Sequence, residues 1–258
     1  MRHHLLPLLP ALVLAGPVHA SAQRTLEARV SVLSSYVWRG LTIVNKPVVQ
    51  PEATLALGAV SFGLWANVEP VRYDGANDIS ALAGRRAPGF TEVDPTVELS
   101  HEVGKVELAA GAIAYAYPHA AGHETAPNTF ELYGSVRLPD AFPLELAGYY
   151  DAHAVKGLYL EAGIERGLPR WPALQVGARI GASFGEASGP ETAYYERDGV
   201  THVELSASLP FTAGPLKLSP EADLDLNVDG ATRITSQTGT HRAKARAGFS
   251  IAWPRGSD

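Results

Sequence analysis

The sequence predicts an all-β protein, a transmembrane antiparallel up-and-down β-barrel of about 12 strands. Three observations support this prediction. Apolar and polar residues alternate through long segments, the connections between these segments are alternately short and longer, and aromatic residues gather near the segment ends. A period of two is typical of extended strands with one apolar and one polar face.

The amino terminus predicts an export signal. Arg2 precedes an apolar run over 5–16, and the small residues Ala-Ser-Ala follow at 20–22, which is the pattern of a secretory signal peptide. The run is shorter than the roughly 20 residues that a spanning helix needs. We therefore expect a secretory signal peptide over 1–22 and an outer-membrane β-barrel over 23–258.

Composition narrows the function classes. The chain has no cysteine, so a scaffold held by disulfides is excluded. Without the signal peptide, which carries one arginine, the chain keeps 20 basic and 27 acidic residues and a net charge of −7. This charge argues against nucleic acid as a partner.

Alternation is clearest in two segments. "TEVDPTVELSHEV" at 91–103 places its acids on one face and mainly apolar residues on the other, and "LKLSPEADLDLNV" at 216–228 does the same. Most such segments have about 10 to 13 residues, enough for a tilted strand to cross a bilayer. The expected strands span about 26–38, 49–58, 60–71, 91–103, 105–117, 128–139, 142–152, 156–167, 173–185, 200–210, 215–228 and 241–253.

The connections indicate which end of each strand faces outward. Tight turns such as "GAV" and "EVGKV" alternate with longer connections, among them 72–90, 118–127, 186–199 and 229–240. Short turns at one end and longer loops at the other are typical of outer-membrane barrels. A secreted soluble β-protein would also alternate, but it would not predict both this asymmetry and the placement of the aromatic residues.

Aromatic side chains near strand ends predict two girdles at the membrane interfaces. If the first strand runs outward, one group lies near the outer end and the other near the periplasmic end. The predicted girdle comprises Tyr36, Trp38, Tyr115, Tyr117, Tyr149, Tyr150, Trp171 and Trp253.

With apolar residues facing lipid, the polar face of each strand is expected to line the interior. Folding the last hairpin about residue 235 sets Asp225 near Lys244 and Asp223 near Arg246, as cross-strand ion pairs. Such charges fit either an open wall that selects solutes or a ladder of ion pairs that fills the interior. The lumen-lining candidates are Arg39, Glu92, Asp94, Glu98, Glu221, Asp223, Asp225, Arg242, Lys244 and Arg246.

The acids on the segment 91–103 have no cations next to them in the sequence, which favours a solvated acidic wall there. A preference for cations would follow if the lumen is open.

Site motifs are weak. "DLDLNVDG" at 223–230 lacks the glycine and the final glutamate of a calcium loop, and "HAAGHE" at 119–124 is interrupted by glycine and better explained as a surface loop. No Gly-x-Ser-x-Gly elbow or phosphate-binding glycine loop is present. We therefore expect no metal site, no cofactor and no enzymatic activity, with a barrel lipid hydrolase as a less favoured alternative.

The segment "SSYVWRGLTIVNKPVVQPEATLALGAVSFGLWANVE" at 34–69 resembles the amino-terminal signature of TorF-family porins. In that signature a strand ends in Tyr-aromatic-x-Arg-Gly, and a proline and a glutamine lead into the next strand. Ser35 stands where the family usually has aspartate, and Phe62, Gly63 and Leu64 replace its glycine-aromatic order. The matching residues are Tyr36, Trp38, Arg39, Gly40, Pro47, Gln50, Trp65 and Asn67.

The resemblance implies a barrel in the outer membrane of a Gram-negative bacterium, surrounded by outer-membrane lipid, with a role as a passive channel for small hydrophilic solutes or ions. A plugged barrel that acts as an interaction or scaffold protein is the alternative, and a homo-oligomer or a periplasmic partner stays open. We expect the stretch at 34–55 to form the outer rim of the first hairpin, with Tyr36 and Trp38 toward lipid and Arg39 toward the lumen.

Overall fold

The computed structural model describes residues 24–71, 88–118, 128–138, 143–188, 195, 197–228 and 242–256. The predicted signal peptide lies outside these residues, as does the stretch 119–127 that contains "HAAGHE". Within the described part, no helix is long and apolar enough to span a membrane.

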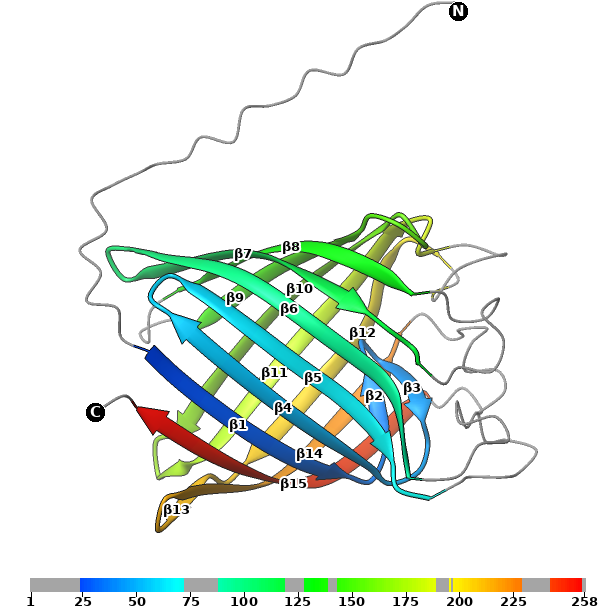
Figure 1. The fold of residues 1–258 in the computed structure, drawn as a ribbon. Helices are drawn as coiled ribbons and strands as arrows, with labels where there is room; N and C mark the ends of the chain where they lie inside the picture. Colours follow the sequence, from blue (N-terminus) through cyan, green and yellow to red (C-terminus); the bar gives the residue numbers. More distant parts are fainter. Residues whose placement is uncertain are drawn as a thin grey trace, which may run out of the picture.

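Twelve antiparallel strands of the described chain form one closed barrel (Figure 1). Each strand pairs with the next along the chain, and β15 pairs with β1 to close the sheet. The barrel strands are β1 (Arg24–Leu33), β4 (Val48–Leu57), β5 (Val60–Glu69), β6 (Gly89–Val103), β7 (Val106–Tyr115), β8 (Thr129–Arg137), β9 (Leu144–Asp151), β10 (Gly157–Leu168), β11 (Trp171–Gly185), β12 (Gly199–Ser208), β14 (Leu216–Asn227) and β15 (Ala243–Gly256).

Three short strands complete the described elements. β13 (Phe211–Ala213) pairs with β14 in the turn after β12. β2 (Tyr36–Trp38) and β3 (Leu41–Val44) pair with each other in a separate two-stranded sheet between β1 and β4. We call residues 34–47, which contain β2 and β3, the bore hairpin.

The predicted fold class is confirmed, and most strand limits agree within a few residues. The first strand is the exception. It was expected to run to Trp38, but β1 ends at Leu33, and Ser34 and Ser35 lead into the bore hairpin. Alternation of apolar residues continues past this break, which is why the sequence suggested one continuous strand.

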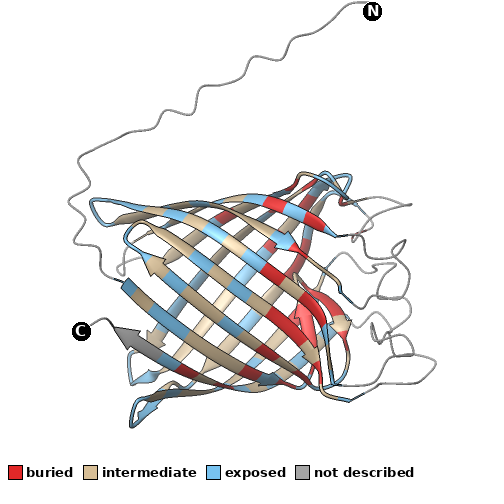
Figure 2. Cartoon of the chain, viewed as in Figure 1, coloured by how far each residue is buried: buried red, intermediate tan, exposed pale blue. Residues whose placement is uncertain are grey.

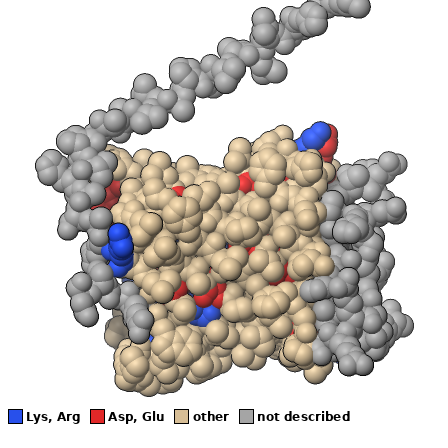
Figure 3. Space-filling view, in the orientation of Figure 1, with Lys and Arg blue, Asp and Glu red and all other residues tan. Residues whose placement is uncertain are grey.

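The two faces of the barrel differ as the alternation requires. Large apolar side chains such as Leu64, Leu99 and Leu132 are more than half exposed on the outside, and the wall seen in Figure 3 carries few charged side chains. Buried residues gather in the half of the barrel that contains β2 and β3 (Figure 2). The outside is therefore apolar, and the inside is filled mainly at one end.

The bore hairpin is packed inside the barrel. Leu41 is fully buried and Tyr36 is 6% exposed, and the tip of the hairpin contacts residues of β8, β9, β10 and β12. The expected position of this stretch at the rim, with Tyr36 and Trp38 toward lipid, is therefore wrong. The alternation of inward and outward side chains along β1 stops at the break that follows Leu33. It therefore does not tell which way the side chains of β2 point.

The apolar exterior predicts how the barrel responds to a charge on its surface. In lipid vesicles, Leu132→Arg on the outer face of β8 is expected to lower the free energy of unfolding by about 2–4 kcal/mol, the cost of an arginine near the bilayer midplane. Urea unfolding followed by tryptophan fluorescence measures this change. Leu132→Ile is the matched control, and equal stability of the two variants would show that this face does not meet lipid.

Candidate functional site in the bore

The bore hairpin turns through two residues with left-handed backbone conformations. Trp38 pairs with Leu41, and the two residues between them, Arg39 and Gly40, have φ angles of 49° and 80°. Positive φ at both central positions defines a type I′ turn, the form that matches the twist of a tight hairpin. Because a non-glycine residue rarely adopts this conformation, contacts of Arg39 with the barrel wall must stabilise it.

An ion pair attaches the hairpin tip to β8. Arg39 Nη1 and Nη2 donate to Glu131 Oε1 and Oε2 at 2.7 and 2.8 Å, and the side chains of the two residues are only 10% and 7% exposed. Tyr115 also donates its hydroxyl to Glu131 Oε2, at 2.8 Å. Bidentate geometry makes this one of the stronger classes of ion pair, and it fixes the direction of the guanidinium.

Aromatic rings surround the same guanidinium. Its central carbon lies 4.5 Å from the ring centroid of Trp38, 4.4 Å from that of Tyr149 and 4.2 Å from that of Tyr159. Tyr195 donates its hydroxyl to the backbone carbonyl of Arg39 at 2.9 Å. Ring faces attract cations, most strongly when the cation is desolvated, so the rings add to the attraction of Glu131.

The opposite side of the tip contacts β12. A Cβ at Gly40 would lie 2.6 Å from Cβ and Cγ of His202, so only glycine fits there. A β-bulge places one extra residue, Thr201, in β12 opposite Gly181 and Ala182 of β11, and both Thr201 and His202 are buried although they are consecutive. Bulges change the direction of side chains in this way, and this one supplies the surface against which the tip packs.

The base of the hairpin is held against β15 and β5. Ser34 exchanges two hydrogen bonds with the backbone of Ala247, through its own N–H at 2.9 Å and to its hydroxyl at 3.0 Å. Tyr36 packs on Trp65 with ring centroids 5.5 Å apart, and Lys244 donates to the side-chain oxygen of Asn45. The hairpin is thus held at both ends.

Acids predicted to form a solvated stripe on β6 are instead partly covered by the hairpin. Glu92 and Asp94 are buried, and Glu92 accepts hydrogen bonds from the hydroxyls of Tyr36 and Tyr117. Glu98 accepts from Tyr133 at 2.7 Å. The prediction of a solvated wall is therefore wrong for Glu92 and Asp94. The tyrosine partners of Glu92 are distant in the sequence.

The remaining lumen candidates lie mainly on β14 and β15. Asp223 pairs with Arg246 at 2.8 Å, and Asp225 faces Lys244 in the ladder, which is the expected register. The side chain of Lys244 is nevertheless directed to Asn45. The buried carboxylate of Asp225 has no hydrogen-bond partner among the residues that the structure describes.

Two further candidates differ in their surroundings. Glu221 pairs with Arg29 of β1 at 3.1 Å, across the strand β15 that lies between them. Arg242 lies just before β15 and is exposed.

The structure divides the predicted aromatic girdle into two groups. Tyr150, Trp171 and Trp253 are 45%, 66% and 43% exposed, as residues on the outside would be. The others contact groups within the bore, so their assignment to the girdle is wrong. These inward residues are Tyr36, Trp38, Tyr115, Tyr117 and Tyr149.

Sequence reasoning missed the aromatic wall of the bore. Tyr133, Tyr149, Tyr159 and His202 form a row in which neighbouring ring centroids are 5.6, 6.2 and 6.3 Å apart. The signal was present, because Tyr133 and Tyr159 share the parity of the polar residues on their strands. The girdle prediction places most aromatic residues by their position near strand ends and not by the face of the strand that they share, so it overlooks this row.

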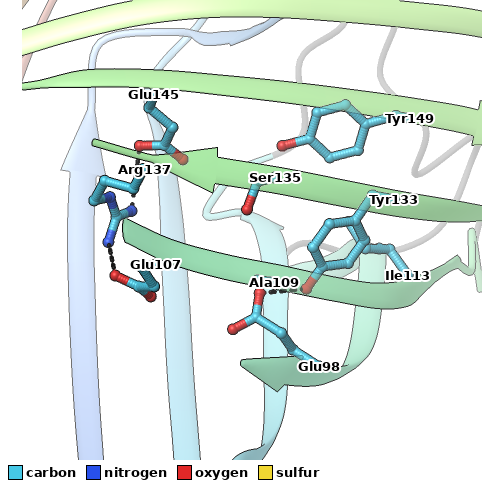
Figure 4. A pocket seen from close by; sticks show the side chains of 9 residues that line it. All are labelled: Glu98, Glu107, Ala109, Ile113, Tyr133, Ser135, Arg137, Glu145 and Tyr149. Carbon is cyan, nitrogen blue, oxygen red and sulfur yellow. Dashed lines mark hydrogen bonds and ion pairs between the residues drawn. The ribbon is translucent and has the colours of Figure 1, made fainter. Parts of the chain in front are cut away.

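The half of the bore away from the tip of the bore hairpin, which we call the inner half, holds a cavity of about 300 Å³. It lies on the wall built by β6, β7, β8 and β9, and its polar lining includes carboxylates, an arginine and a serine (Figure 4). In the described part of the chain, no group of three or more histidines or acids could hold a metal ion. The residues that line the cavity offer charged, hydroxyl and aromatic groups.

The arrangement around the buried histidine gives no support to a lipid hydrolase. His202 Nδ1 lies 3.0 Å from the hydroxyl of Thr201, but both residues are buried beneath the hairpin tip. A lipid in the surrounding bilayer would not reach them there.

Comparisons with known proteins give only distant similarity. A scan against family models finds no match, and neither does a search of the curated proteins. Among solved structures, a KdgM porin is 10% identical over 89% of this chain and 98% of its own, with a TM-score of 0.47. An outer-membrane channel from Pseudomonas putida is 13% identical over 96% and 100%, also with a TM-score of 0.47.

The outer-membrane phospholipase A from Escherichia coli is also similar, 12% identical over 93% of both chains with a TM-score of 0.45. With identities this low and TM-scores below 0.5, none of these similarities assigns a function, and the TorF-family resemblance stays a prediction.

The buried ion pair at the hairpin tip leads to a test of docking. Glu131→Gln leaves the guanidinium of Arg39 buried without its counter-charge, and removing one partner of a buried pair costs about 3–5 kcal/mol. We expect the backbone amides of residues 36–44 to lose hydrogen-exchange protection, measured by NMR in detergent micelles. The control is Glu107→Gln, which removes an exposed pair with Arg137 worth at most about 1 kcal/mol. Equal protection in both variants would contradict the docked hairpin.

Proposed function

We propose that the protein is an outer-membrane channel for small hydrophilic solutes or ions, narrowed at its outer end by the bore hairpin. One observation supports this most strongly: a closed barrel with an apolar exterior has a charged interior that is only partly filled. A polar interior is typical of barrels that conduct. The cavity in the inner half shows that the hairpin does not fill the whole bore.

The bore is expected to favour cations. Five arginines of the wall and hairpin are paired with acids, namely Arg29, Arg39, Arg137, Arg179 and Arg246. Arg137 and Arg179 each have two acidic partners. Further acids, such as Glu98 and Asp225, have no cationic partner in an ion pair among the described residues. A wall with excess negative charge raises the local concentration of cations.

A barrel closed by its hairpin is the second candidate. The dense packing around Arg39 and Leu41 favours it, because a fully docked tip could block the outer end. Such a barrel would serve as a scaffold rather than a channel. Conductance of the refolded chain in a planar bilayer separates the two, since a scaffold predicts no channel events at any voltage.

Two glycine variants test whether the hairpin sets the width of the channel. Both Gly40 and Gly58 have positive φ, but a Cβ at Gly40 would meet His202 whereas a Cβ at Gly58 would meet nothing within 4 Å. Gly40→Ala should displace the tip and raise the single-channel conductance. Gly58→Ala, which carries a similar backbone cost of about 1–2 kcal/mol, should leave it unchanged. An equal conductance in the two variants would argue against a hairpin constriction.

Charge removal on β14 tests selectivity. Replacing Asp223 and Asp225 together by asparagine removes two negative charges and leaves Arg246 without its acidic partner. We expect the reversal potential in a potassium chloride gradient to shift toward anion preference. An unchanged reversal potential would mean that these acids do not line the conducting path.

A further inference from the structure

The inner cavity combines negative charge with aromatic surface. Its lining includes three carboxylates, from Glu98, Glu107 and Glu145, but only one cation, Arg137 (Figure 4). When all four are ionised the lining carries a net charge of −2. A cavity of this charge attracts small cations and repels anions.

Arg137 is already engaged, whereas Glu98 has no cationic partner. Arg137 bridges Glu107 and Glu145 at 3.2 Å each, near the inner ends of their strands. Glu98 accepts the hydroxyl of Tyr133 at 2.7 Å, and no cation among the described residues pairs with it. Its carboxylate is therefore the group in the cavity that lacks a counter-charge.

Tyr133 presents a ring face beside this carboxylate. The ring lies against Gly111 of β7, its cross-strand partner, where a Cβ would come within 2.6 Å of two ring carbons. Glycine thus leaves room for the ring against the wall, and Tyr133 is among the residues that line the cavity. The ring also stacks on Tyr149, with centroids 5.6 Å apart, which extends the aromatic surface.

The same wall already holds one organic cation. Immediately along the row, the guanidinium of Arg39 lies over Tyr149 and Tyr159 and pairs with Glu131. A carboxylate beside aromatic faces is therefore how this protein binds its own guanidinium. Glu98 and Tyr133 likewise place a carboxylate beside an aromatic ring in the cavity. Among the described residues, no arginine or lysine of the protein lies over the ring of Tyr133.

We infer that the cavity is a binding site for small organic cations that carry a guanidinium or ammonium group. The cation lies over the ring of Tyr133 and pairs with Glu98, while Glu107 and Glu145 contribute to the negative potential around it. Attraction to the ring face and to the carboxylate act together. This inference rests on the proposed function, because a solute reaches the cavity only through the bore.

Calorimetric titration of the refolded barrel in detergent micelles tests the site. Agmatine, which carries both a guanidinium and an ammonium group, is the probe, and gluconate and glucose are the anionic and neutral comparators. We expect agmatine to bind and the two comparators not to bind. Absence of agmatine binding, or glucose binding of equal affinity, would overturn the inference.

Variants identify the groups that bind. Glu98→Gln and Tyr133→Leu should each raise the dissociation constant of agmatine by about 3-fold or more, as expected when a cation loses a carboxylate or a ring face. Tyr133→Phe retains the ring and should bind within about 2-fold of the wild-type chain. Glu27→Gln, an exposed acid on β1, is the charge-matched control and should have no effect.

The outcomes separate this site from the proposed channel. Circular dichroism confirms folding of each variant, and if Tyr133→Leu does not fold, the comparison of Glu98→Gln with Glu27→Gln decides. Equal affinities in that comparison would overturn the site. Conductance without agmatine binding contradicts only the cation site, whereas agmatine binding without conductance supports the site and contradicts the channel.

Discussion

Closure of the sheet is the constraint on which the rest of the structure depends. Pairing of β1 with β15 leaves no free edge, so every strand has one face outside and one inside. Apolar residues such as Leu64 and Leu132 occupy the outside, and charged residues are directed inward, where they need partners. The interior is therefore a set of polar groups in a confined space, and the bore hairpin supplies several of the missing partners.

The bore hairpin satisfies this requirement at the outer end. Arg39 neutralises Glu131, Tyr36 donates to Glu92, and Asn45 accepts from Lys244. In return, the wall stabilises a tight turn that would be strained in isolation, through His202 against Gly40 and through rings around the guanidinium. The inner end has no such insert, and there the charges pair across neighbouring strands or line the cavity. One barrel thus has one half packed by the bore hairpin and another half with an acidic and aromatic cavity.

Most of the fold could be predicted from the sequence, because alternation is a local property that survives closure of the barrel. The strand register of β14 and β15 was also accessible, since Asp223 and Arg246 are opposite charges in one hairpin. The bore hairpin could not be predicted from the sequence. Its two strands continue the apolar pattern of β1, and the residues that hold its tip, such as Glu131 and Tyr159, lie on distant strands. Only the Arg-Gly pair between alternating segments could have suggested a type I′ turn.

The central claim is that the hairpin tip is docked across the bore against β12. Nuclear Overhauser contacts in the refolded, isotope-labelled chain test it without any substitution. A docked tip predicts contacts between the α-protons of Gly40 and the side chain of His202, because these groups are in van der Waals proximity. Contacts of the Gly40 α-protons with sequence neighbours alone would contradict it and place the tip outside the bore.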